Sequence, residues 1–87
     1  MNAFDPSLVR RGLDQLLKRN PHLDLIKIEW TDLGRGPWVI VELGQPSASF
    51  EQAPAWAVHR FAIWRRTGAV HTVDHEGAAS DDPVLTP

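Results

Sequence analysis

The sequence contains no cysteine and no tyrosine, and no apolar stretch approaches the length of a membrane-spanning helix. Without cysteine the chain has no disulfide, no thiolate ligand for zinc and no thiol nucleophile. The first residues lack the basic start and apolar run of a secretory signal, so we expect a soluble, cytoplasmic protein. Seven arginines against two lysines are typical of a bacterial genome of high GC content.

Motifs that carry chemistry are missing as well. No serine lies in a nucleophile elbow, and the Asp81-Asp82 carboxylates lie next to a proline near the end of the chain, where little holds a pair rigid. The Gly34-Arg35-Gly36 turn is too short for a dinucleotide fingerprint and precedes a strand-like run instead of a helix. We therefore expect neither an enzyme nor a bound cofactor.

The composition is otherwise that of an ordinary globular domain. The chain has 87 residues, of which 43% are hydrophobic and 23% are charged, with a net charge of −2. A chain of this length forms one domain with one modest core. Its pattern of elements predicts an α+β fold over 1–87, with one N-terminal helix packed on a four-stranded, mostly antiparallel sheet.

A helix is predicted over 6–19. Asp5-Pro6 suits a helix start, because the aspartate can accept backbone N–H groups and proline at the first helical position loses no needed donor. Apolar side chains then recur at helical spacing, at Val9, Leu13, Leu16 and Leu17. Asn20-Pro21 ends the segment, since proline cannot continue a helix.

Two strands are predicted next, over 23–31 and 38–43. In the first strand the side chains alternate, so that Ile26, Ile28 and Trp30 form one apolar face. The second strand is a continuous apolar run rich in β-branched residues. The residues between the two strands are dense in turn formers, so we expect a hairpin.

The apolar stretch that follows fits two structures. As a helix it would extend over about 50–65, with Ser49 and Gln52 as a capping box. As a strand it would extend over 57–65 and pair with a fourth strand over 69–74, which is the structure that we favour. Small residues, turn formers and prolines then predict a loosely held tail over 76–87, in which Val84-Leu85 can dock on the core.

The predicted hairpin has a definite register. A turn over 66–68, with Gly68 supplying the positive φ, sets Arg60 opposite Asp74 and apolar residues opposite one another. The same register sets His59 opposite His75.

Histidines placed in this way can share a divalent ion. His59 and His75 would lie on the same face as His71. His71 and His75 are too far apart along one strand to bind the same ion. A third ligand is therefore missing, and His59 and His75 are only weak metal candidates. We expect no metal site.

The aromatic composition is the most unusual feature, with four tryptophans in 87 residues. A domain this small can hardly bury all four, and an exposed tryptophan beside arginine has the make-up of a protein–protein hot spot. The candidate partner-binding residues are Trp38, Arg35, Trp64, Arg65 and Arg66. The sequence therefore predicts a small interaction module that binds another protein or, through an unpaired edge strand, a second copy of itself.

Nucleic-acid binding is the alternative function. The polar side of the predicted helix carries Arg10, Arg11 and Lys18, which could contact phosphates. The net charge of −2 and the sequence pI of about 6.0 disfavour this function, because most nucleic-acid-binding domains are basic.

Overall fold

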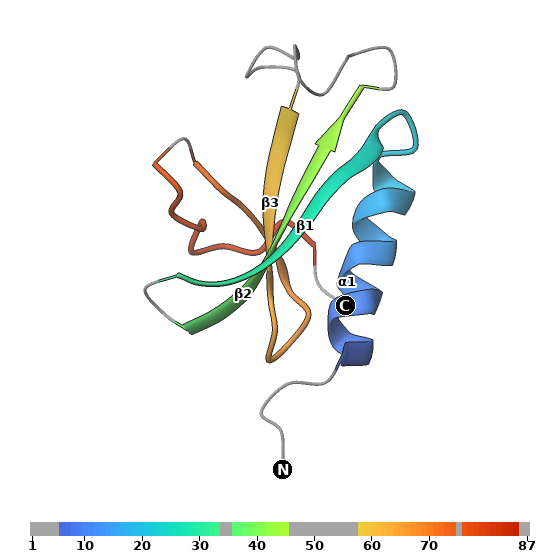
Figure 1. The fold of residues 1–87 in the computed structure, drawn as a ribbon. Coiled ribbons are helices and arrows are strands. Elements are labelled where there is room, and N and C mark those ends of the chain that lie inside the picture. The colour runs from blue at the N-terminus through green and yellow to red at the C-terminus, as the bar shows by residue number, and fades with distance from the viewer. Residues whose placement is uncertain (1–5, 34–35, 46–57, 75, 86–87) are drawn as a thin grey trace.

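The computed structural model describes residues 6–33, 36–45, 58–74 and 76–85, and it confirms the predicted α+β fold. One helix precedes four strands that pair antiparallel in the order β1-β2-β3-β4, and the helix lies along one side of the sheet (Figure 1). The elements are α1 (Pro6–Arg19), β1 (Asp24–Leu33), β2 (Gly36–Gly44), β3 (Val58–Trp64) and β4 (Val70–Thr72).

The helix α1 has the bounds that the sequence predicts. Its buried face contains Val9, Gly12 and Leu16, in agreement with the predicted apolar stripe. At its C-terminal end the side-chain amide of Asn20 donates a hydrogen bond of 2.8 Å to the carbonyl oxygen of Leu16. This bond satisfies one of the carbonyl groups that a helix end leaves without a partner, so Asn20 both ends and caps α1.

Two glycines allow α1 to approach the turn between β3 and β4 very closely. A Cβ atom on Gly12 would lie 2.5 Å from the carbonyl oxygen of Gly68, and one on Gly68 would collide with the backbone of Leu8. Gly68 also has a φ of +77°, the left-handed conformation that the sequence predicts for this turn. The helix is therefore held against the β3–β4 side of the sheet.

The core lies between α1 and the sheet. Its buried residues come from α1 and from the strands β2, β3 and β4. Two more come from the turn between α1 and β1 and from the segment after β4. The core residues are Val9, Leu16, Leu23, Val39, Val41, Leu43, Ile63, Val70 and Leu85. The strand β1 contributes none of these residues, so most of the packing energy comes from β2, β3 and the helix.

The strand β1 contains a bulge that the alternating pattern does not predict. Leu25 is paired with Leu43 and Lys27 with Glu42, so Ile26 is an extra residue without a partner position on β2. The extra residue changes the phase of the alternation, and Leu25 therefore shares the face of Leu43.

The third predicted strand is confirmed over 58–64, and the helical alternative is wrong for these residues. The rest of the alternative helix, 50–57, lies outside the described residues. β-branched and aromatic side chains pair across β2 and β3, with Val39 opposite Ile63 and Val41 opposite Phe61. Such cross-strand pairs stabilise a sheet, and they outweigh the helical spacing of the same segment.

The predicted register between β3 and β4 is wrong by one residue. Phe61 is opposite Thr72 and Ala62 is opposite His71, because the turn contains one residue more than expected. The amide of Gly68 donates to the carbonyl oxygen of Trp64 at 2.7 Å, which closes a turn over 65–68. As a consequence the amide of Val73, and not that of Asp74, donates a hydrogen bond to the carbonyl oxygen of Arg60.

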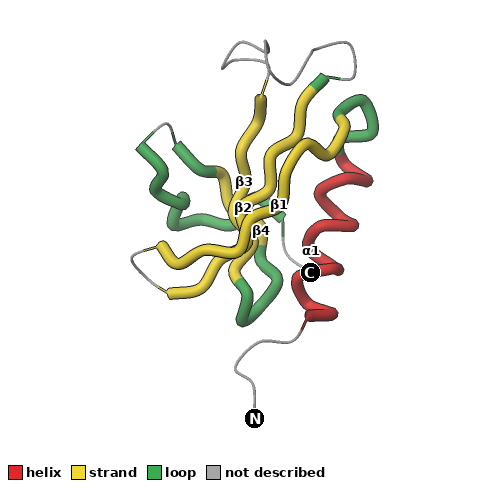
Figure 2. The backbone as a smooth tube through the Cα atoms, viewed as in Figure 1, coloured by secondary structure: helices red, strands yellow, loops and turns green. Residues whose placement is uncertain are grey.

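The strand β4 is shorter than predicted, because the chain turns at Asp74. One carboxylate oxygen of Asp74 accepts hydrogen bonds from the amides of Glu76 and Ala78, at 2.9 and 3.0 Å. The chain then returns along the sheet, where Val73 bridges to Ala79, as the loop beside β4 in Figure 2 shows.

The described part of the tail is tied to the sheet. The amide of Val70 donates to the carbonyl oxygen of Leu85 at 2.9 Å, and the Leu85 side chain is buried in the core. The prediction of a loosely held tail over 76–87 is therefore corrected for its described residues, whereas the docking of Val84-Leu85 is observed.

Candidate functional site

Exposed apolar side chains gather on the edge strand β1. Among the described residues the large apolar side chains with high exposure are Leu25, Ile28, Trp30 and Val84. All but Val84 lie on β1, and Trp30 is the most exposed at 58%. Single exposed apolar residues are ordinary on protein surfaces, but a cluster of them marks an interaction site.

A hollow of about 300 Å³ lies between this strand and the helix, and we name it the β1 groove. The strand β1 contributes Ile28 and Trp30, and α1 contributes Pro6, Val9 and Leu13, with Arg10 and Asp14 beside them. The remaining lining residues are the core side chains Val39, Val41 and Ile63. The groove is open because α1 is held against β3 and β4, so that none of the described segments covers the β1 side of the same sheet face.

An arginine from the turn after β3 stacks on the exposed tryptophan. The guanidinium carbon of Arg65 lies 4.7 Å from the centre of the Trp30 ring, within the range of a cation–π contact. Arg65 is half-buried, and its amide donates to the carbonyl oxygen of Pro37 at 3.3 Å. The contact fixes the orientation of Trp30 at the mouth of the β1 groove.

The opposite face of the sheet carries a row of alternating charge. Lys27 is paired with Glu42 and Glu42 with Arg60 across three neighbouring strands. Arg60 donates through Nε and Nη2 to one oxygen of Glu42, at 3.0 and 2.8 Å. The Lys27 ammonium lies 3.3 Å from a carboxylate oxygen of Glu29.

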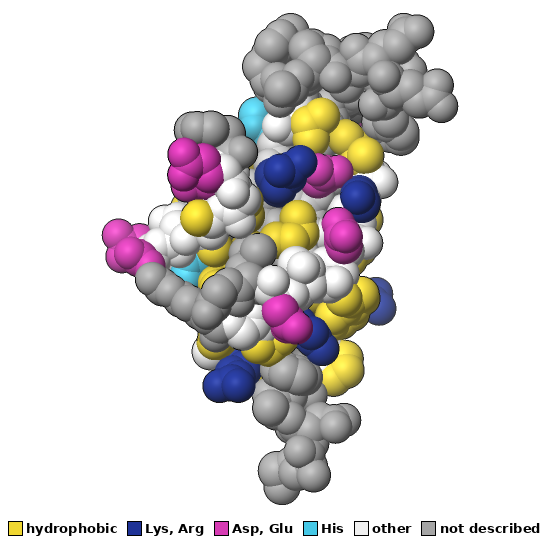
Figure 3. Space-filling model, turned by 60° about the vertical axis from the view of Figure 1, so that its left-hand side comes forward, with side chains coloured by type: hydrophobic (Ala, Val, Ile, Leu, Met, Phe, Trp, Pro, Cys, Tyr) yellow, Lys and Arg dark blue, Asp and Glu magenta, His cyan; other side chains and the backbone are white. Residues whose placement is uncertain are grey.

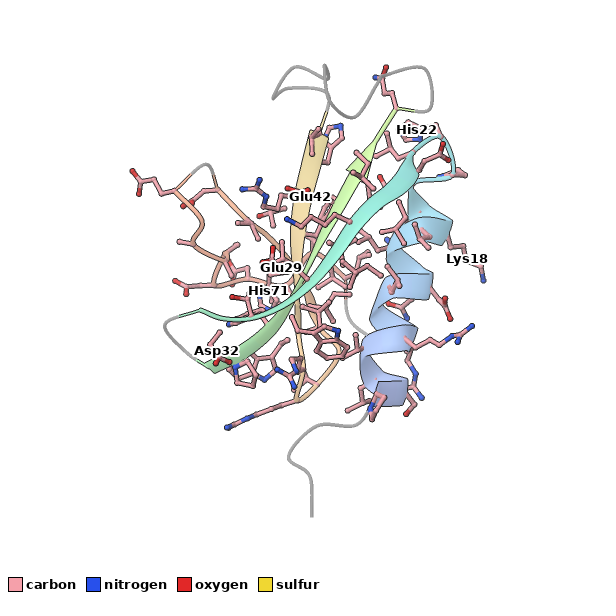
Figure 4. The ribbon with its side chains drawn as sticks, in the orientation of Figure 1. Lys18, His22, Glu29, Asp32, Glu42 and His71 are labelled. Atoms are coloured by element: carbon pink, nitrogen blue, oxygen red, sulfur yellow. The ribbon has the colours of Figure 1, made fainter. Side chains whose placement is uncertain are left out.

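The figures show where this row lies. Figure 3 shows basic and acidic side chains next to one another over the sheet, and Figure 4 shows Glu29 and Glu42 on its side away from α1. Lys27 and Glu29 bring the charged row to the edge strand, so polar groups border the open edge on this face and apolar groups border it on the other.

The structure buries one of the two tryptophans proposed from sequence as partner contacts. Trp38 is only 3% exposed and packs edge-on against Trp64, with ring centres 4.6 Å apart, and against His71, at 5.1 Å. Trp38 therefore offers no surface to a partner. The rings of Trp64 and His71 pack against it from β3 and β4.

The remaining predicted residues have different surroundings. Trp64 is half-buried, and the Arg66 guanidinium carbon lies 5.9 Å from the centre of its ring, so these two are neighbours as expected. Arg65 contacts Trp30 instead, and Arg35 lies outside the described residues. The site that sequence reasoning missed is the pair Ile28 and Trp30, which the alternating pattern placed on an apolar face without showing that the helix would leave it open.

The histidines are not brought together as the sequence suggested. The one-residue shift in register removes the basis for setting His59 opposite His75, and His75 itself lies outside the described residues. His59 and His71 lie on opposite faces of the sheet, since His59 pairs with Leu43 and His71 with Ala62. Within the described ranges there is no cluster of three or more His, Cys, Asp or Glu residues that could hold a metal ion.

His71 has a structural partner. Its Nδ1 atom lies 2.7 Å from the carbonyl oxygen of Ser80, and because a carbonyl only accepts, the ring donates at this nitrogen. The bond ties the returning tail to β4, and the His71 ring also packs edge-on against Trp38.

The three basic residues of the nucleic-acid alternative lie on the exposed face of α1. Arg10, Arg11 and Lys18 are all exposed, and Figure 4 shows Lys18 pointing away from the sheet. Asp14 interrupts this face, since its carboxylate lies 3.9 Å from the Nε of Arg10. The helix face is therefore mixed in charge.

Comparisons add no relative from which a function could be transferred. No protein-family model matches the chain, and no curated protein or solved structure matches it either. In the described part of the chain, no helix is both long and apolar enough to span a membrane.

Proposed function

We propose that this protein is a non-enzymatic, cytoplasmic interaction module that binds a partner protein in the β1 groove. The observation that carries the proposal is the gathering of Leu25, Ile28 and Trp30 on one edge strand beside an open apolar hollow. Fully burying a large apolar side chain contributes roughly 1.5–3 kcal/mol. These side chains are about half exposed, so a partner that covers them recovers part of that free energy.

The contact between Trp30 and Arg65 supports the same proposal. Tryptophan and arginine are the residue types most enriched at binding hot spots, and here they are already stacked in the free protein. A side chain held in place before binding loses less conformational entropy when the partner arrives. We therefore assign Trp30 as the central anchor, with Ile28 and Arg65 beside it.

Photo-crosslinking in cells that express the natural gene tests the proposal. A photoreactive phenylalanine derivative in place of Trp30 should form adducts with a protein, identified by mass spectrometry. The same derivative in place of Lys18, which is exposed on α1 away from the groove, should form few or none. Equal adduct yields at the two positions, or none at position 30, would contradict the assignment of the groove.

The second candidate function is nucleic-acid binding by α1, which is favoured by the shared exposed face of Arg10, Arg11 and Lys18. Phosphate contacts release counterions, so the affinity for a mixed-sequence oligonucleotide should fall steeply between low and physiological salt. The variant Arg11→Ala should weaken binding and flatten the salt dependence. Affinity that does not change with salt or with this substitution excludes this function.

A further inference from the structure

The open edge of the sheet can accept another strand. Within the part of the chain that the structure describes, β1 pairs only with β2, and its outer edge is left with backbone N–H and C=O groups that no strand satisfies. The strand has ten residues, which is long for an uncovered edge. An edge of this kind is a template for pairing with a further chain.

We propose that the partner bound beside the β1 groove is a second copy of this chain, joined by antiparallel pairing of the two β1 strands around Ile28. The inference rests on the proposed function and names its partner. In a two-fold symmetric pair, a residue that lies a given number of positions before the centre is opposite the residue the same number of positions after the centre in the second copy. The strand must therefore be complementary to itself. The sequence of β1 meets this requirement in one register.

With Ile28 facing its own copy, Lys27 lies opposite Glu29 of the second copy, and Glu29 lies opposite the second Lys27. The same register sets Ile26 opposite Trp30 of the second copy. Opposite charges thus meet on one face of the sheet and apolar side chains on the other, as cross-strand pairs require.

Neighbouring registers lack this complementarity. Moving the centre to Glu29 sets two glutamates directly opposite each other, and moving it to Trp30 sets Ile28 opposite Asp32. Like charges directly opposite one another destabilise a strand pair. The bulge at Ile26 bends the strand at one end, so the pairing extends from Ile26 to Trp30.

The charged row on the sheet continues across such an interface. Arg60, Glu42 and Lys27 already alternate in sign across β3, β2 and β1, and Glu29 of the second copy is the next charge in the row. This charge complementarity is the reason for choosing a second copy over an unrelated peptide, since β1 itself carries the acidic and basic side chains that its own charge pattern requires on the opposite strand.

The apolar side of the interface fits the same arrangement. A two-fold axis perpendicular to the sheet places both α1 helices on the same side of a continuous eight-stranded sheet, and it makes neighbours of the two β1 grooves. Ile28 and Trp30 of the two copies then lie side by side across the interface and shield part of one another's apolar surface. The pairing therefore satisfies the open edge and reduces the exposure of the apolar side chains on β1.

Charge reversal at two positions tests the inference. Lys27→Glu sets acidic side chains against each other across the interface, and Glu29→Lys does the same with basic ones, so each variant alone should raise the dimer dissociation constant by about tenfold or more. An equimolar mixture of the two variants restores both opposite-charge pairs and should form a heterodimer. Sedimentation velocity measures the dimer, and native mass spectrometry identifies the heterodimer.

The control is Lys18→Glu, which makes the same charge change on the exposed face of α1 and should leave the dimer intact. Circular dichroism of all variants shows whether they remain folded. A wild-type protein that is monomeric at its solubility limit, a dimer that tolerates either reversal, or a mixture that fails to associate would each overturn the inference.

The outcomes for the inference and for the proposed function can be told apart. If the wild-type protein is monomeric while position 30 crosslinks to a different protein, the second copy is wrong and the groove remains the binding site. If position 30 crosslinks to the same chain and the charge-swapped mixture restores the dimer, both stand. If position 30 gives no adduct and the protein is monomeric, both fail.

Discussion

The two edges of the sheet differ in length and in what covers them. The strand β4 has three residues, and the returning tail bonds it at Val70. The strand β1 has ten residues, no described strand pairs with its outer edge, and several of its large side chains are exposed. The protein therefore protects one edge and leaves the other available, which is expected when one edge serves binding and the other serves only the fold.

The closed edge depends on groups that are distant in sequence. The helix reaches the β3–β4 turn through Gly12 and Gly68, and the tail reaches β4 through Leu85. On the open edge Arg65 from the turn after β3 stacks on Trp30, but among the described residues no tail or strand other than β2 pairs with β1. Substitutions at the closed edge should consequently affect folding, and those at the open edge should affect association.

The largest expected effect is the difference in stability loss between substitutions of the buried Trp38 and of the exposed Trp30. Trp38→Ala removes a buried ring and should destabilise the protein by about 4 kcal/mol, whereas Trp30→Ala should cost less than about 1 kcal/mol in stability. Urea unfolding followed by circular dichroism measures both. Equal losses would mean that Trp30 belongs to the core, and the contrast between the edges would be lost.

The next effect concerns the close approach of α1 to the β3–β4 turn. Gly68→Ala adds a methyl group against the backbone of Leu8 and strains a left-handed residue, so it should cost about 3 kcal/mol. Gly77→Ala is the matched control, since Gly77 also has positive φ but has open space around it, and it should cost only about 1 kcal/mol. Thermal unfolding separates the two, and similar losses would show that the helix does not press on the turn.

A smaller effect tests the tail that closes the β4 edge. Leu85→Ala should destabilise the protein by about 2 kcal/mol, because the side chain is buried in the core. Val84→Ala, one residue earlier and exposed, should change the stability by less than about 0.5 kcal/mol. Hydrogen exchange at the amide of Val70, which donates to Leu85, should rise in the first variant and not in the second.

The smallest effect concerns the charged row beside the open edge. A double-mutant cycle on Glu42 and Arg60 should give a coupling of about 0.5–1 kcal/mol, since the pair is hydrogen-bonded and the glutamate side chain is only 17% exposed. The same cycle on Arg10 and Asp14, which are far more exposed, should give a coupling near zero. A reversed order would mean that exposure does not control the strength of these pairs.

Much of the fold followed from local pattern. The helix over 6–19, the strand character of 58–64 and the positive φ of Gly68 were all predicted, because capping, apolar spacing and turn chemistry act between near neighbours. The candidate site was predicted only in part. Arg65 was named, but as a neighbour of Trp64, and Trp30 was placed on an apolar face without being assigned to binding.

The sequence by itself determined the helix and the first two strands and favoured a strand over a helix for the third, since those choices depend on residues close together in the chain. Only the tertiary structure decided the bulge at Ile26, the register of β4 and the burial of Trp38, because each depends on contacts between distant segments. The glycine contact that holds α1 over β3 and β4 also left β1 uncovered. The β1 groove is thus a consequence of packing, and the pattern of residues in β1 alone does not contain it.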